Sequence, residues 1–117
     1  MKYKIVPSTK FKKDLKLAIK RSYDISLLEQ IIESLTHGKR LSARYKDHAL
    51  SGNYSNCREC HITPDWLLVY EISENELILY LTRTGTHSDL FYYLYFGLLI
   101  YNIHLFYPII LDSFLFQ

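Results

Sequence analysis

The sequence predicts an α+β domain in which an N-terminal strand and a helical hairpin pack on an antiparallel β-sheet. Two features of the pattern support this fold class. Before residue 40 apolar residues recur at helical spacing, whereas from Tyr54 onward they follow the pattern of strands, in runs such as "WLLVY" and "LILYL". The chain has 117 residues, 49% of them hydrophobic and 22% charged, which is typical of one globular domain.

The N-terminal half is expected to form a short strand followed by two helices. We expect the strand over residues 3–6, and Pro7 ends it. Ser8 is well placed to cap a first helix that runs to about Arg21. The capping-box sequence "SLLE" then opens a second helix at Ser26, which stops at a glycine, Gly38.

The second half is expected to form a three-stranded meander. The predicted strands span residues 54–62, 66–72 and 77–83, and a polar turn at 73–76 joins the last two. Their apolar residues point to both faces, as expected of a sheet with helices on one side. His48 would lie in the loop that leads into the first of these strands.

The charges are distributed unevenly along the chain. Residues 1–46 hold twelve Lys or Arg against four Asp or Glu, and the remainder holds two against eight. The basic half is therefore expected to face an anionic partner, nucleic acid or an acidic protein segment, with a solvated helix surface as the alternative. Two cysteines cannot form a disulfide framework, and no apolar signal segment opens the chain, so we expect a cytoplasmic protein.

The C-terminal residues 92–117 differ from the rest. An uncharged run of 22 residues lies between Asp89 and Asp112, long enough to span a bilayer as a helix of about 33 Å. Gly, Asn, His and Pro interrupt it, and no basic residue follows it to fix an orientation. We therefore favour a packed apolar element or a tail from a shifted reading frame over a membrane anchor at residues 90–111.

The sequence Cys57-Arg-Glu-Cys60-His61 matches the motif Cys-x-x-Cys-His of c-type haem attachment sites. On an extended strand, however, two cysteines three positions apart point to opposite faces and cannot reach one haem or one metal. A zinc site would need two further ligands, and there is no second pair of cysteines. The same alternation places Glu59 and His61 on one face, together with Cys57.

Histidines, carboxylates and an arginine recur at the predicted ends of the strands. These residues are His48, Glu59, His61, Asp65, Arg83 and His87. RNA carries its own nucleophile, so a ribonuclease needs a base for the 2′-OH, an acid for the leaving 5′-oxygen and a cation for the phosphate. The residue types suit this metal-independent reaction, although spacing alone is also compatible with structural roles.

Three ordered motifs, "YKDHAL", "PDWLLVY" and "RTGTHSDLF", together with the Lys-rich first helix, resemble the YafQ branch of the RelE/ParE toxin superfamily. The resemblance covers residues 1–91. It implies a RelE-like, microbial-ribonuclease-like fold and an mRNA interferase that cleaves the message in the ribosomal A site. It implies no cofactor and no metal.

The resemblance also implies roles for individual residues. His87 would donate the proton to the leaving oxygen. The residues His48 and His61, assisted by Asp65 and with Glu59 beside them, would be candidates for activating the 2′-OH. The substrate-binding residues would be Arg83 at the scissile phosphate, Phe91 on the message, and Lys46.

The partners implied are the ribosome with its rRNA, the mRNA, and a DinJ-like antitoxin, with operator DNA bound only through the antitoxin complex. Two departures from the family pattern stand out. Glu59-Cys60-His61 replaces Asp-Ala-His, and the chain continues past residue 91, where family members end. A ParE-like gyrase-binding toxin and a catalytically inactive binding module of the same fold are the alternatives.

Overall fold

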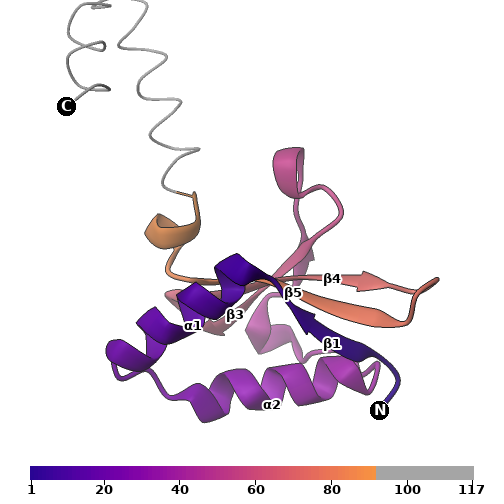
Figure 1. Ribbon diagram of the computed structural model, residues 1–117, viewed down its shortest axis with the longest axis horizontal. Coiled ribbons are helices and arrows are strands. Elements are labelled where there is room, and N and C mark those ends of the chain that lie inside the picture. The colour runs from indigo at the N-terminus through magenta and orange to yellow at the C-terminus, as the bar shows by residue number, and fades with distance from the viewer. Residues whose placement is uncertain (92–117) are drawn as a thin grey trace, which may run out of the picture. The chain divides into compact units, whose positions relative to one another are not determined.

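A five-stranded sheet forms the framework, with the strand order β1-β5-β4-β3-β2 (Figure 1). The strands are β1 (Lys4–Pro7), β2 (His48–Ala49), β3 (Arg58–Thr63), β4 (Trp66–Ser73) and β5 (Ile78–Gly85). This computed structural model describes residues 1–91. The apolar tail predicted at 92–117 lies outside the described residues.

The sheet is mixed rather than wholly antiparallel. Strands β2 to β5 form the predicted antiparallel meander, but β1 pairs in parallel with β5, with Lys4 opposite Ile78 and Pro7 opposite Leu81. A parallel pair needs a crossover connection between its strands. The helical hairpin and the strands β2 to β4 together form this connection between β1 and β5. The strand β1 is thereby added beside β5 at the edge of the sheet.

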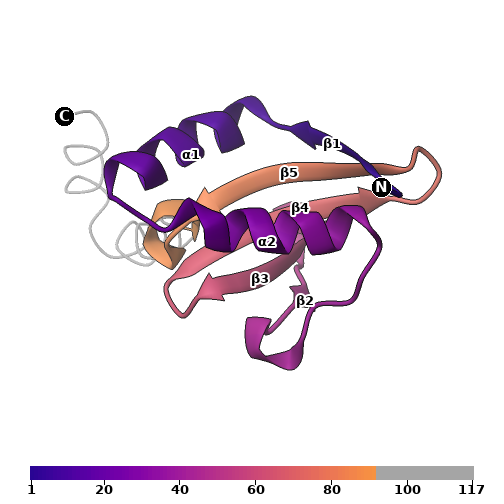
Figure 2. The same cartoon turned by 90° about the horizontal axis from the view of Figure 1, so that it is seen from below.

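Two helices cover one face of the sheet, as Figure 2 shows. They are α1 (Thr9–Lys20) and α2 (Ile25–Thr36). The Ser8 hydroxyl accepts a hydrogen bond from the Phe11 amide at 2.9 Å, which confirms the predicted cap of the first helix.

The second helix begins one residue earlier than predicted. Its cap is Asp24, whose Oδ1 accepts from the Ser26 amide at 3.1 Å, so the predicted cap at Ser26 is wrong. The Asp24 carboxylate precedes the helix and can accept from a free amide of the first turn, whereas the Ser26 hydroxyl already lies within that turn. The helix ends at Thr36, and Gly38 follows with a φ of +72°. A left-handed residue here favours glycine, as predicted.

The core lies between the helices and the sheet. The helices contribute Phe11, Ala18, Leu28, Ile31 and Leu35, and the strands contribute Cys60, Ile62, Trp66, Leu68, Tyr70, Leu79 and Leu81. All of β4 from Trp66 to Tyr70 is buried on both faces. Packing of this apolar surface is the main source of stability for a domain of this size.

Two boundaries differ from the sequence prediction in the region that leads to the site. The strand predicted at residues 54–62 begins only at Arg58, because Gly52–Tyr54 forms a 3₁₀ turn and the Cys57 amide donates to the Tyr54 carbonyl at 2.8 Å. His48, predicted in a loop, lies on the short strand β2 and pairs with Glu59. The backbone of the loop thus continues the sheet by one more strand.

The last predicted strand is shifted by one or two residues. It runs from Ile78 to Gly85, because Leu77 has a φ of 56° and belongs to the turn. The chain divides into two units after His87, and residues 87–91 are helical. Within residues 1–91 no helix combines the length and the apolar character needed to cross a bilayer.

Candidate active site

A buried carboxylate, Glu59, lies between two imidazoles. Glu59 lies on β3, between β2 and β4, and its side chain is 6% exposed. Its Oε1 lies 3.5 Å from Nε2 of His48 and 4.0 Å from Nε2 of His61. The two imidazole rings are 6.3 Å apart. The predicted pairing of Glu59 with His61 on one face is confirmed, and the strand β2 brings His48 to the same carboxylate.

Both imidazoles present the same nitrogen to Glu59. Nδ1 of His48 lies 2.7 Å from the Lys46 carbonyl, and Nδ1 of His61 lies 3.4 Å from the Pro64 carbonyl. A carbonyl can only accept, so Nδ1 carries the proton in each ring and Nε2 faces the carboxylate. Each imidazole therefore turns one nitrogen to a backbone carbonyl and the other to the Glu59 carboxylate, both of which accept hydrogen bonds.

The second oxygen of Glu59 has no hydrogen-bond partner among the described residues. This oxygen, Oε2, is buried. A buried polar atom without a partner costs free energy and is uncommon in folded proteins unless the site has another use for it. Glu59 therefore keeps an acceptor available inside the cluster.

A second carboxylate, Asp47, holds the segment that carries His48. Its Oδ1 accepts from Nε of Arg58 at 3.1 Å, and its Oδ2 accepts from the Tyr70 hydroxyl at 2.7 Å. Burial and this hydrogen bond raise the pKa of Tyr70 above its usual value. Because Asp47 is tied to β3 and β4, the backbone at Lys46 and His48 is fixed relative to Glu59. Sequence reasoning missed this residue, and its place inside "YKDHAL" was the only signal.

Arg83 is held by a residue of the first helix. Its Nε donates to Oδ2 of Asp14 at 2.7 Å and its Nη2 donates to Oδ1 at 3.1 Å. The Asp14 side chain is 14% exposed and that of Arg83 18%. The hydrogen bond with Asp14 raises the pKa of Arg83. Two of its nitrogens are therefore committed to Asp14, which was not among the predicted site residues.

The other predicted site residues lie in different surroundings. Asp65 is exposed in the turn between β3 and β4 and lines a hollow with Tyr23 and Trp66. His87 is exposed and starts the helical segment after β5. Phe91 belongs to the following unit. Lys46 is exposed in a left-handed conformation directly before Asp47.

The two cysteines occupy different environments, but Cys57 precedes β3, so the prediction that it lies on a strand face with Glu59 and His61 is wrong. Cys60 is fully buried in the core, whereas Cys57 is half-buried with its Sγ 3.9 Å from Oγ1 of Thr82. Burial raises the pKa of Cys60 to about 12 and also raises that of Cys57. Among residues 1–91 no group of three or more His, Cys, Asp or Glu is arranged to hold a metal ion.

Neither thiol is expected to react readily in the folded protein. The thiolate is the reactive form, and a pKa near 12 leaves Cys60 about a thousandfold less thiolate than an ordinary thiol in mildly alkaline solution. Iodoacetamide labelling followed by mass spectrometry should modify Cys60 slowly in native protein and fast after unfolding in urea. Rapid labelling of native Cys60 would contradict its place in the core.

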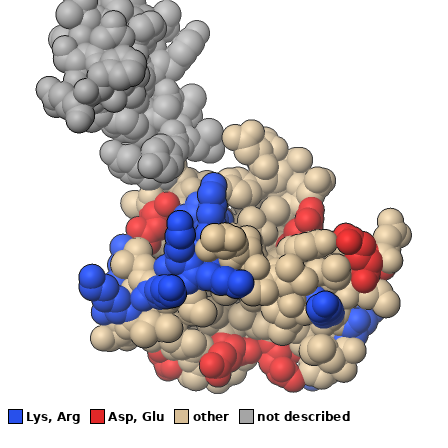
Figure 3. Space-filling view, in the orientation of Figure 1, with Lys and Arg blue, Asp and Glu red and all other residues tan. Residues whose placement is uncertain are grey.

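Basic side chains gather on the exposed surface of α1, as the blue atoms in Figure 3 show. The exposed lysines of this helix are Lys10, Lys12, Lys13, Lys16 and Lys20. Two apolar side chains lie among them, Leu17 at 40% and Ile19 at 57% exposure. This surface combines positive charge with exposed apolar area, which suits an anionic or an acidic, partly apolar partner.

Two of the solved structures that are similar to this chain are bacterial toxins. A metal-bound toxin from Helicobacter pylori is similar with a TM-score of 0.72 and 45% identity, covering 76% of this chain and 99% of that toxin. The Escherichia coli DinJ-YafQ toxin–antitoxin complex contains a chain with a TM-score of 0.71 and 38% identity, covering 78% of this chain and 99% of that chain. The fold, shared with these toxins, is thus that of the RelE-like class of toxins.

The sequence comparisons give the family. Residues 3–92 match the family described as "Bacterial toxin of type II toxin-antitoxin system, YafQ". The mRNA interferase toxin YafQ of Escherichia coli strain K12 is 40% identical over 85 residues, which cover 72% of this chain and 90% of that protein. The chain belongs to the YafQ family of type II toxins, which confirms the resemblance drawn from the three motifs.

Proposed function

We propose that this mRNA interferase toxin cleaves RNA at the cluster of His48, Glu59 and His61, with His87 as the proton donor. The observation that carries the proposal is the buried Glu59 carboxylate shared by two imidazoles that present Nε2 to it. One of these imidazoles takes the proton of the 2′-OH, and Glu59 stabilises the imidazolium that forms. No metal enters this chemistry.

The bond changes of the reaction are those of an intramolecular transesterification. The 2′-oxygen forms a bond to phosphorus, the bond from phosphorus to the 5′-oxygen breaks, and His87 protonates that oxygen as it leaves. The upstream fragment keeps a 2′,3′-cyclic phosphate. Arg83, held in place by Asp14, would meet the charge on the phosphate with its positive charge, and Lys46 would add positive charge near His48.

The remaining roles in the proposal come from the family resemblance. Phe91 would contact the message. Asp65 would act from the turn that follows His61, by orienting the substrate rather than through a hydrogen bond to an imidazole of the cluster. The substrate is mRNA in the ribosomal A site, and the ribosome would supply the RNA surface that the basic helix α1 meets.

An acidic antitoxin is the second partner proposed. One of the similar structures is a DinJ-YafQ complex, and the basic surface of α1 with Leu17 and Ile19 offers charge and apolar area for such a protein. Binding there would compete with rRNA for the same lysines. Operator DNA would be bound through the antitoxin in this arrangement, and the toxin would act in the cytoplasm.

The test of the function is cleavage of a defined message on purified ribosomes. We expect cuts in the A-site codon, mapped by primer extension, and a 2′,3′-cyclic phosphate on the upstream fragment. A message with a 2′-O-methyl group on the A-site riboses should resist cleavage, because it has no hydroxyl to act as the nucleophile. Equal cleavage of the methylated and unmodified messages would contradict the mechanism, and no cleavage of either would contradict the function.

A further inference from the structure

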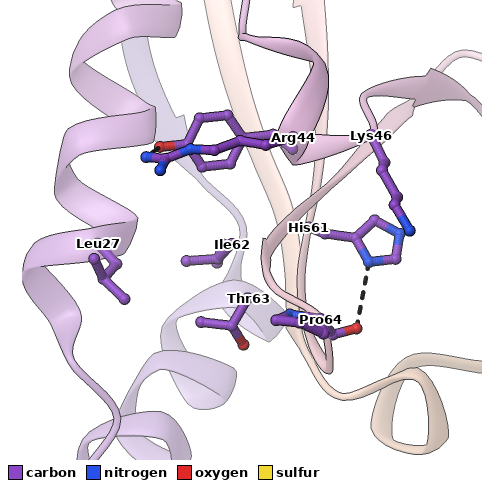
Figure 4. A pocket seen from close by; sticks show the side chains of 8 residues that line it. Leu27, Arg44, Lys46, His61, Ile62, Thr63 and Pro64 are labelled. Carbon is purple, nitrogen blue, oxygen red and sulfur yellow. Dashed lines mark hydrogen bonds between the residues drawn. The ribbon is translucent and has the colours of Figure 1, made fainter.

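A hollow of about 420 Å³ adjoins the catalytic cluster through His61 (Figure 4). It lies between α2, the 3₁₀ turn η1 (Ala43–Tyr45) and the end of β3. The side chains that the argument uses are Leu27, Arg44, Tyr45, Lys46, His61 and Ile62. Its volume falls in the range of about 300–1,000 Å³ that is usual for small-molecule sites.

The walls of the hollow differ in chemistry. Figure 4 shows Leu27, on the helix, opposite Lys46 and His61, with Ile62 between them and Arg44 above. One wall is therefore apolar, and the other carries a lysine and an imidazole. A ligand with a flat apolar part and an anionic part matches both walls at once.

The upper wall adds a planar cation. The Arg44 guanidinium lies over the ring of Tyr45, 4.7 Å from its centre, and donates a hydrogen bond to the Tyr45 hydroxyl. This contact holds the planar guanidinium in a fixed orientation in the wall of the hollow. A guanidinium plane can stack on a nucleobase or pair with a phosphate, which a lysine cannot do in the same way.

The hollow and the cluster share one imidazole. His61 faces Glu59 with Nε2 at 4.0 Å, and its Nδ1 is directed to the Pro64 carbonyl. The His61 ring therefore lies between Glu59 and the hollow. A phosphate bound at His61 could carry one nucleoside that extends into the hollow.

We propose that this hollow binds one nucleotide of the message, the one next to the scissile phosphate. Its base lies against Leu27 and Ile62 with the Arg44 guanidinium beside it, and its phosphate lies toward Lys46 and His61. This inference rests on the proposed function and names the part of the substrate that the site holds. A side chain of the antitoxin is the competing occupant, which the experiment below separates.

The experiment is an NMR titration of the isotope-labelled toxin with each of the four nucleoside monophosphates, with inorganic phosphate as the anion control. We expect chemical-shift changes at Leu27 and Ile62 with nucleotides and none there with phosphate alone. Leu27→Trp, which fills the hollow, and Lys46→Ala should each weaken nucleotide binding by about tenfold. Lys39→Ala is the matched control, an exposed lysine that does not line the hollow, and should bind nucleotides as the unsubstituted toxin does.

Three results would overturn the inference. They are equal nucleotide binding by Leu27→Trp and the unsubstituted toxin, shifts at Leu27 with phosphate alone, and a loss of antitoxin affinity in Leu27→Trp with nucleotide binding unchanged. Cleavage on ribosomes is measured on the same samples. A toxin that cleaves but binds no nucleotide in the hollow contradicts only this inference, whereas one that binds nucleotides and does not cleave contradicts only the proposed function.

Discussion

Replacing His87 by Ala is expected to lower the rate of mRNA cleavage on ribosomes by about 10²- to 10⁴-fold, the usual contribution of a general acid. Without the imidazole, the 5′-oxygen leaves unprotonated. His87 is exposed at the start of a helical segment, so its removal should change the free energy of unfolding by less than about 0.5 kcal/mol. Affinity for the antitoxin should stay the same. Single-turnover cleavage and thermal unfolding measure the two effects separately.

The chain contains a matched control for this substitution. His37 is an exposed histidine at the end of α2, where Nδ1 lies 2.8 Å from the Glu33 carbonyl. His37→Ala should cleave within about twofold of the unsubstituted toxin, because a surface substitution away from the site changes little. If His87→Ala cleaves at the same rate as His37→Ala, His87 is not the proton donor.

Replacing Asp14 by Ala is expected to lower the free energy of unfolding by about 2 kcal/mol, somewhat less than the loss typical of a fully buried ion pair, because this pair is only partly buried. Three hydrogen bonds depend on this carboxylate. Two come from Arg83, and the Thr84 amide donates the third to Oδ2 at 3.1 Å. With both side chains less than one-fifth exposed, solvent cannot replace Asp14 fully. Urea denaturation monitored by Trp66 fluorescence measures the loss.

A double-mutant cycle distinguishes the ion pair from a general effect on α1. The double variant Asp14→Ala with Arg83→Met should be less destabilised than the sum of the two single variants, because no unpaired charge remains. Glu33→Ala is the control, since Glu33 is exposed on α2 and its carboxylate lies near His37, which is also exposed. If Asp14→Ala is no more destabilising than Glu33→Ala, the Arg83 contact does not stabilise the fold.

Local patterns in the sequence predicted most of the secondary structure. Helical spacing and Ser8 placed α1 correctly, because a cap and a period of 3.6 residues act within a few residues of one another. The strands β4 and β5 were predicted with shifts of one or two residues at their ends. Those boundaries depend on hydrogen bonds to other strands, which a local pattern does not contain.

The β2–β3 region was predicted less well. The turn at Gly52–Tyr54 and the strand β2 are too short to give a periodic signal, so the first meander strand was predicted to begin too early, at Tyr54, and His48 was predicted to lie in a loop. The parallel position of β1 was missed for a related reason. Which strand a short edge strand pairs with depends on the packing of the helices between them, not on its own residues.

Part of the candidate site was visible in the sequence. The alternation of side chains on β3 predicted that Glu59 and His61 share a face and that Cys60 points away into the core, and the structure agrees. The same argument removed the haem interpretation of the cysteine motif. The roles of these residues in catalysis stay predictions, with the experiments above as their tests.

By itself, the sequence determined the family, the two amphipathic helices, the uneven charge and the common face of Glu59 and His61, because each depends on residue order and local period. Only the tertiary structure decided that His48 joins Glu59, that Asp47 bonds to Tyr70 and that Asp14 holds Arg83, 69 positions away. Such contacts arise from strand register and helix packing, which join residues far apart in the chain, and no local pattern records them.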